Sequence, residues 1–108
     1  MSNSVFQSVI SQLKEISDRT FGVIDTDGYV ISSTDAAFLG ERWQEAAVKA
    51  ASCFEGVVTF NQKTFKPIFS NTNYLEYAVF CSGDDECAKL ACQMAYISLN
   101  DAKAFYEE

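Results

Sequence analysis

One short stretch of this sequence restricts the fold more than any other: two apolar runs that flank the turn Thr26-Asp27-Gly28. The runs cover residues 21–25 and 29–33, and each has the length of a strand. An Asp-Gly pair between such runs is typical of a tight β-hairpin, because glycine accepts a positive φ without a Cβ clash. The sequence therefore predicts an antiparallel hairpin in its first third.

Three further segments have the periodicity of helices. Apolar residues at three- and four-residue steps predict a helix over residues 4–18. A second helix is expected over about 41–54, after a break at Gly40, and a third over about 84–107, where acidic residues suit the start of a helix. The first and third carry more apolar residues than one sheet face can cover, so a homodimer through these two helices is expected.

Three more strands are expected in the second half of the chain, over residues 57–60, 63–69 and 74–81. Pro67 cannot donate a ladder hydrogen bond, so we expect an outward-facing position or a bulge there. The predicted order is helix–strand–strand–helix–strand–strand–strand–helix. We therefore expect a single α+β domain over residues 1–108, with helices packed on a five-stranded antiparallel sheet.

Composition excludes several classes of function. The chain has 15 acidic and 8 basic residues among 108, and its net charge of −7 argues against nucleic acids and anionic membranes as partners. It contains no histidine, which excludes Ser-His-Asp and Cys-His catalysis and His-ligated zinc. No side-chain nucleophile has a base at motif spacing, so we expect a protein that is not an enzyme.

The N-terminal residues 1–5 lack the basic start of a signal peptide, and no run of 18 apolar residues occurs anywhere in the sequence. Neither secretion nor a membrane span is therefore expected. A cytoplasmic location follows as the expectation, and the same features fit a domain taken from a longer chain.

Four cysteines, Cys53, Cys81, Cys87 and Cys92, are separated by 27, 5 and 4 residues. These spacings match neither zinc ribbons nor ferredoxin-type clusters. Cysteine at the end of an apolar segment commonly packs as a small hydrophobic residue, and we expect this role here. A disulfide such as Cys81–Cys87 and a metal site are the alternatives.

The residues Asp25-Thr26-Asp27-Gly28 resemble the start of a calcium loop. An EF-hand loop needs an oxygen ligand at its fifth position and a glycine at its sixth. Tyr29 occupies the fifth position in this chain. A hairpin turn is therefore the expected role, and neither a metal nor a cofactor is expected.

A small-molecule site is expected between the segment 33–43 and the sheet. This segment leads from a strand end to a helix N-terminus, where backbone N–H groups favour an anion, and Arg42 would bind a carboxylate through two hydrogen bonds. The alternative is that Arg42 is a surface residue paired with Glu45 or Asp35, that Trp43 packs in the core, and that the Ser/Thr run over residues 32–34 is a cap. The expected ligand-binding residues are Ser33, Thr34, Arg42 and Trp43, with Lys66 as a second charge and with Phe60 and Phe69 as apolar walls.

The stretch Val23–Asp35, followed by Leu39-Gly40-Glu41, resembles the signature of the sugar-diacid-recognition domain, the N-terminal sensor of carbohydrate-diacid-type transcription regulators. It is also similar to N-terminal domains of purine-catabolism-type regulators. In these proteins a hairpin of the form D-x-x-G-x-I-x-x-S-T-D leads through I/L-G into a helix, and the similarity covers about residues 23–47. The family often has a histidine soon after this glycine, where this chain has Arg42 and Trp43.

The resemblance implies a cytoplasmic sensor domain that binds a small metabolite, such as a carboxylate, and passes a signal through its terminal helices. The DNA-binding part of such regulators would lie C-terminal to this domain, outside this sequence. The predicted element order is also shared by the profilin-like group, which includes roadblock-type, PAS and GAF domains. The alternative function is therefore a roadblock-type dimerisation or scaffold module that binds another protein and no small molecule.

Overall fold

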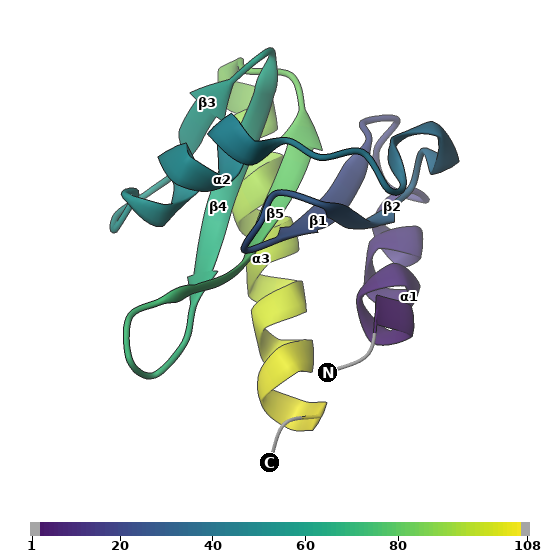
Figure 1. The fold of residues 1–108 in the computed structure, drawn as a ribbon. Coiled ribbons are helices and arrows are strands. Elements are labelled where there is room, and N and C mark those ends of the chain that lie inside the picture. Colours follow the sequence, from purple (N-terminus) through teal and green to yellow (C-terminus); the bar gives the residue numbers. More distant parts are fainter. Residues whose placement is uncertain (1–2, 107–108) are drawn as a thin grey trace.

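A five-stranded antiparallel sheet forms the centre of the structure, and helices lie on both of its faces (Figure 1). The structure is a computed structural model that describes residues 3–106. The strand order is β2-β1-β5-β4-β3 with antiparallel neighbours throughout, which confirms the predicted α+β class and element order. The helices are α1 (Asn3–Leu13), η1 (Ala36–Phe38, a 3-10 helix), α2 (Gln44–Ala51) and α3 (Glu86–Tyr106), and the strands are β1 (Phe21–Asp25), β2 (Val30–Ser33), β3 (Val58–Phe60), β4 (Lys63–Phe69) and β5 (Leu75–Ser82).

The Asp-Gly turn joins β1 to β2, as the sequence predicts. Gly28 has a φ of 89°, and a Cβ at this position would collide with the Trp43 carbonyl. The Asp25 carboxylate accepts hydrogen bonds from the N–H groups of Asp27 at 2.9 Å and Tyr29 at 3.0 Å. The carboxylate that begins the calcium-like sequence therefore holds the hairpin turn in place.

One face of the sheet is covered by α1 and α3, and we call it the helix-covered face. Small residues on α3 let this helix approach the sheet closely, and Phe6 of α1 packs edge-to-face on Tyr77 with ring centroids 4.9 Å apart. The result is one continuous apolar core. Its buried members are Phe6, Ile10, Phe21, Val23, Ile68, Val79, Cys81, Ala88, Cys92, Ala95 and Leu99.

The opposite face is covered by η1, α2 and the chain between them, and we call it the open face (Figure 1). Its buried cluster comprises Ile24, Val30, Ala46, Ala47, Ala50, Phe65, Ala78 and Phe80. Gly22 lies under the ring of Phe80, and a Cβ there would collide with that ring. The Phe80 ring therefore lies over a position of the sheet that carries no side chain.

The β2 edge of the sheet is covered by other backbone and side-chain groups. The Val30 N–H donates to the Glu41 carbonyl at 2.8 Å, and the Gly40 N–H donates to the Val30 carbonyl at 3.1 Å. The Gln7 side-chain amide accepts from the Ser33 N–H at 3.1 Å and donates to the Ser33 carbonyl at 3.0 Å. An edge occupied in this way offers little template for the addition of another strand.

The second helix begins at Gln44 rather than at Glu41, because the preceding residues pair with the hairpin turn. Arg42 forms an antiparallel bridge with Tyr29, and the Trp43 N–H donates to the Gly28 carbonyl at 2.7 Å. These bonds keep the backbone before Gln44 extended. The helix ends at Ala51, before the predicted end at residue 54.

The other helix boundaries also differ from the sequence prediction. α1 ends at Leu13, because the last α-helical hydrogen bond is donated by Lys14 and both Glu15 and Ile16 donate three residues back as the chain turns toward β1. At the start of α3, Asp85 is the N-cap and its carboxylate accepts the Ala88 N–H at 2.9 Å, which is the main reason that the pKa of Asp85 is lowered. The predicted end of this helix at residue 107 lies outside the described residues.

Pro67 lies inside β4, in register with Ala78 of β5, and a register irregularity follows between Ile68 and Phe69. β3 pairs with β4 only over residues 63–65, so Pro67 lies beyond that pairing. Both features accommodate a residue that has no N–H to donate. Within residues 3–106, no helix combines the length and the apolar character that a membrane crossing requires.

Candidate functional site

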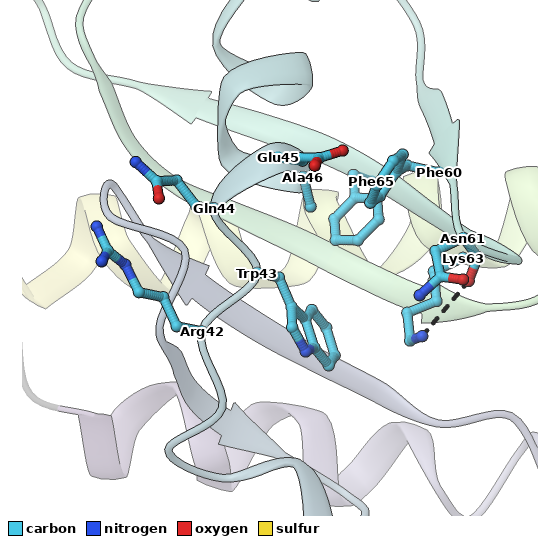
Figure 2. A pocket seen from close by; sticks show the side chains of 9 residues that line it. All are labelled: Arg42, Trp43, Gln44, Glu45, Ala46, Phe60, Asn61, Lys63 and Phe65. Carbon is cyan, nitrogen blue, oxygen red and sulfur yellow. Dashed lines mark hydrogen bonds between the residues drawn. The ribbon is translucent and has the colours of Figure 1, made fainter.

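A cavity of about 370 Å³ lies in the open face, between the start of α2 and the β3–β4 hairpin (Figure 2). Its volume falls in the range of about 300–1,000 Å³ that is typical of small-molecule sites. We call it the Trp43 pocket. The lining residues on which its chemistry depends are Trp43, Gln44 and Glu45 at the start of α2, and Phe60, Lys63 and Phe65 on the hairpin.

Aromatic rings form the base of the Trp43 pocket. The Trp43 ring packs edge-to-face against Phe80 and Phe38, with centroid separations of 4.8 and 5.4 Å, and Phe65 lies 6.3 Å away. The indole N–H donates to the exposed Glu41 carboxylate at 2.9 Å, which fixes the orientation of the half-buried ring. The base is therefore rigid and apolar, and it provides flat contact area for a ligand.

Lys63 supplies the positive charge of the pocket. Its Nζ atom lies 4.9 Å from the centroid of the Trp43 ring and 5.5 Å from that of Phe38, and it donates to the Asn61 carbonyl at 3.5 Å (Figure 2). The two turn residues Asn61 and Gln62 have φ values of 51° and 61°, as a type I′ hairpin requires. The turn thus fixes the first residue of β4 beside the aromatic base.

The start of α2 adds a second source of positive potential. Ala47 donates to the Trp43 carbonyl at 3.2 Å, and Trp43 makes no side-chain cap. The N–H groups of residues 44–46 therefore belong to the first turn, where no acceptor lies within the helix. Glu45 places one carboxylate at the same rim, so the pocket combines a cation, free donors and an acceptor.

The structure brings some of the predicted ligand-binding residues together and separates others. Trp43 and Phe60 both line the pocket. Arg42 contributes to the rim, but its guanidinium turns away from Lys63 (Figure 2). It lies 5.3 Å from the centroid of the Tyr29 ring, and its Nε donates to the Asp27 carbonyl at 3.1 Å. In this position Arg42 braces the hairpin turn.

Ser33 and Thr34 lie outside the pocket, and their side chains bond to backbone groups. The Ser33 hydroxyl accepts the Asp35 N–H at 3.0 Å, and the Thr34 hydroxyl accepts the Phe21 N–H at 3.1 Å. The Asp35 carboxylate in turn accepts the Ala37 N–H at 3.0 Å and caps η1. These side chains hold the strand end and the 3-10 turn, which agrees with the capping role that was the alternative for them.

Lys66 and Phe69 also lie away from the pocket. The Lys66 ammonium donates to the Gly56 carbonyl at 2.8 Å and lies 4.8 Å from the ring of Tyr96 on α3, so it belongs to the helix-covered face. Phe69 stacks on Phe54, with ring centroids 5.2 Å apart. Alternate residues of a strand point to opposite faces, and Lys63 is the lysine that shares the face of Phe65.

The cysteines are free thiols with different surroundings. Cys81 and Cys92 are buried in the core of the helix-covered face, while Cys87 is exposed and Cys53 is half-buried. Burial raises the pKa of Cys81 to about 11 and raises the pKa of Cys92 further, so both thiols stay protonated and unreactive near neutral pH. Among the described residues, no cluster of three or more Cys, Asp or Glu side chains is arranged to hold a metal ion.

The assignment of a role to the Trp43 pocket rests on the geometry of the pocket itself. No model of a known protein family matches the chain, and no curated protein or solved structure is significantly similar to it.

Proposed function

We propose that the chain is a small-molecule-sensing regulatory domain that binds an organic acid in the Trp43 pocket. The observation that carries this proposal is the Lys63 ammonium, which lies over the Trp43 ring at the rim of a cavity of about 370 Å³. A cation beside a rigid apolar base favours a ligand that has one charged end and one flat or apolar side. The first-turn N–H groups of α2 add donors for the same charged end.

The other polar groups that line the pocket restrict which organic acids fit it. Glu45 also lines the pocket, and its carboxylate disfavours a ligand that is negatively charged throughout. The same carboxylate accepts hydrogen bonds from hydroxyl groups, as does the Asn61 side-chain amide. A polyhydroxy acid satisfies both ends of the pocket, with its carboxylate at Lys63 and its hydroxyls at Glu45. Sugar monoacids are therefore the first ligands to test, and the sugar diacids that the resemblance in residues 23–47 implies are tested beside them.

The two faces of β4 provide a route from the pocket to the terminal helices. Phe65 lines the pocket, and its neighbour Thr64 faces α3, where the Cys92 thiol donates to the Thr64 carbonyl at 3.5 Å. A shift of β4 on ligand binding would therefore act directly on the packing of α3. This coupling supports a role as the sensor of a cytoplasmic transcription regulator, which is the output that the sequence resemblance implies.

The test is a thermal-shift screen followed by calorimetry, with sugar monoacids, sugar diacids, simple dicarboxylates and neutral sugars as the probes. A ligand present at about 100 times its dissociation constant stabilises the native state by about 2.7 kcal/mol, which raises the melting temperature by roughly 10 °C in a domain of this size. We expect a sugar acid to give such a shift and the matching neutral sugar to give none.

Two lysine variants make the test specific to the pocket. Lys63→Met keeps most of the side chain but removes the charge, and we expect it to weaken binding at least tenfold. Lys66→Met removes an equivalent charge three positions along the same strand, on the opposite face, and should bind as the parent does. Equal affinities of the parent and Lys63→Met would contradict the assignment of the site.

The second candidate is a roadblock-type scaffold module, and exposed apolar side chains on α3 favour it. A module of this kind needs no ligand in the Trp43 pocket. If none of the acids shifts the melting temperature while α3 binds another protein, the scaffold role replaces the sensor role.

A further inference from the structure

The outer side of α3 carries a row of exposed apolar residues. Leu90, Met94 and Ile97 are 62%, 51% and 59% exposed, and their three- and four-residue spacing places them on one stripe. This stripe lies on the side of the helix opposite the buried residues of the core. It is also on the far side of the sheet from the Trp43 pocket, so it is a separate feature of the molecule.

The stripe continues into a groove between the ends of α1 and α3. The groove has a volume of about 260 Å³, and its lining includes Leu13 and Ile16 on one side and Leu90 and Met94 on the other. Ile16 is 72% exposed. These side chains together present roughly 500 Å² of apolar surface, which is at the upper end for a patch on a monomeric protein.

Charge distinguishes this surface from the rest of the chain. α3 contains two acidic residues, Glu86 and Asp101, and two basic residues, Lys89 and Lys103, so its net charge is zero in a chain of net charge −7. A strongly basic partner would find its charge complement elsewhere on this protein. A second copy of the chain, by contrast, can bring its own neutral stripe against this one without like-charge repulsion at the contact.

We infer that the stripe of Leu90, Met94 and Ile97, with the groove beside it, binds the same surface of a second copy around a two-fold axis near Met94. The helices run antiparallel in this arrangement. Two patches of this size bury about 1,000 Å² in total, which is the lower limit for a specific interface, so a dimer that dissociates in the micromolar range is expected.

Asp101 sets the antiparallel direction. It lies on the stripe, and a parallel pair would place the two Asp101 carboxylates side by side in an apolar contact. In an antiparallel pair centred on Met94, Asp101 lies over the first turn of α3 in the second copy, close to the end of the groove that Arg19 lines. Arg19 is already paired with Asp85 at 3.1 Å and Glu86 lies in the same turn, so the antiparallel direction follows from separating the two Asp101 carboxylates and not from a new ion pair.

Sedimentation equilibrium tests the dimer. At high concentration the chain should approach twice its mass of 12.0 kDa, and the association should strengthen several-fold when salt is raised from about 20 to about 300 mM, because salt screens the repulsion between two acidic chains. The variant Met94→Glu/Ile97→Glu should be monomeric. Val48→Glu, at a residue on α2 that is 65% exposed, is the matched control and should dimerise like the parent.

A chain that stays monomeric at hundreds of micromolar overturns the inference, and so does a Met94→Glu/Ile97→Glu variant that is folded by circular dichroism and dimerises as tightly as the parent. Ligand binding is measured separately on the same variant. It should keep the affinity of the parent for an acid in the Trp43 pocket, so a failure of the dimer and a failure of the sensor role give different results.

Two further variants test the direction of the helices. Asp101→Asn should leave the affinity of an antiparallel dimer within about twofold of the parent, whereas it would strengthen a parallel dimer several-fold by removing the carboxylate pair. In the antiparallel dimer the two Cys87 thiols are about 20 Å apart along the helix. In a Cys53→Ser background, diamide should therefore cross-link Met94→Cys but leave the chain with Cys87 alone uncross-linked, and cross-linking through Cys87 would overturn the antiparallel arrangement.

Discussion

The two faces of the same five-stranded sheet differ in how tightly they are packed. On the helix-covered face, α1 packs against β1 and β2, the 21-residue α3 packs against β4 and β5, and the side chains of the core there are almost fully buried. On the open face, the eight-residue α2 and the 3-10 turn cover a smaller area, and Phe38, Trp43 and Phe60 stay half-buried around a cavity. The first face is closed to solvent, and the second keeps room for a ligand.

The difference arises from the residues that each face presents. α3 places small side chains, Ala88, Cys92 and Ala95, against the strands, so the helix lies close to the sheet and leaves little space. The open face combines a short alanine-rich helix with large rings, and rigid rings packed edge-to-face leave a gap that a flexible side chain would fill. Close packing is therefore concentrated on one face, and the larger cavity lies on the other.

The largest effect is expected from truncation of one aromatic ring on each face, Phe6 on the helix-covered face and Phe38 on the open face. Phe6→Ala should lower the free energy of unfolding by about 3–5 kcal/mol, because the ring is fully buried and its loss leaves a cavity among packed neighbours. Phe38→Ala should cost less than half as much, since that ring is half-buried beside an existing cavity. Urea denaturation followed by circular dichroism measures both, and equal losses would show that the two faces do not differ in this way.

Alkaline pH should destabilise the protein through the buried thiols of the helix-covered face. An unfolded Cys81 ionises with a pKa of 9.0, whereas burial raises its pKa in the folded protein to about 11. Above pH 9 the unfolded chain therefore binds fewer protons than the native one, and the free energy of unfolding falls by about 2–3 kcal/mol as pH rises to 11 from this thiol alone. Cys92 acts in the same direction.

The measurement is urea denaturation between about pH 8 and pH 11. The variant Cys81→Ala/Cys92→Ala is less stable at neutral pH because it leaves small cavities, but its stability should depend less steeply on pH above 9. Parallel pH profiles for the parent and this variant would exclude the buried thiols as the cause.

The smallest expected effect concerns the open face and uses the single tryptophan as its own probe. The Lys63 ammonium lies 4.9 Å from the Trp43 ring and attracts anions to it. Lys63→Met should reduce quenching of Trp43 fluorescence by iodide about twofold at low salt, without reducing quenching by neutral acrylamide. Lys66→Met should leave both unchanged, and an unaltered iodide effect in Lys63→Met would place the cation elsewhere.

The sheet and its helices could be predicted because each depends on short-range patterns. The Asp-Gly turn, the period-two strands and the periodic helices all lie within one segment of chain, and the structure reproduces their order. The helix ends depended on distant partners. α2 begins at Gln44 only because the Trp43 N–H bonds to the hairpin turn, and no local signal in residues 41–43 indicates that contact.

The site was predicted in part, for a related reason. Trp43 and Phe60 follow from their positions at a helix start and a strand end, but the side chain of Lys66 points to the opposite face of β4. Counting alternate residues from Phe65 selects Lys63 instead, which lies at the pocket. The bond from the Phe21 N–H to the Thr34 hydroxyl joins positions far apart in the sequence, so it could not be foreseen.

The strand order has a consequence for how the chain reaches this structure in time. The hairpin β1–β2 and the meander β3–β4–β5 each join neighbours in the sequence, and hairpins of this kind form within microseconds. β1 and β5 are different, since Phe21 pairs with Cys81 and Asp25 with Tyr77, more than fifty residues away. Among the strand pairs of the sheet, β1–β5 encloses the longest loop. Its closure therefore costs the most conformational entropy, and this cost arises before the contacts between the two strands form. We therefore expect the pairing of β1 with β5 to limit the rate of folding, and both faces of the sheet depend on this pairing.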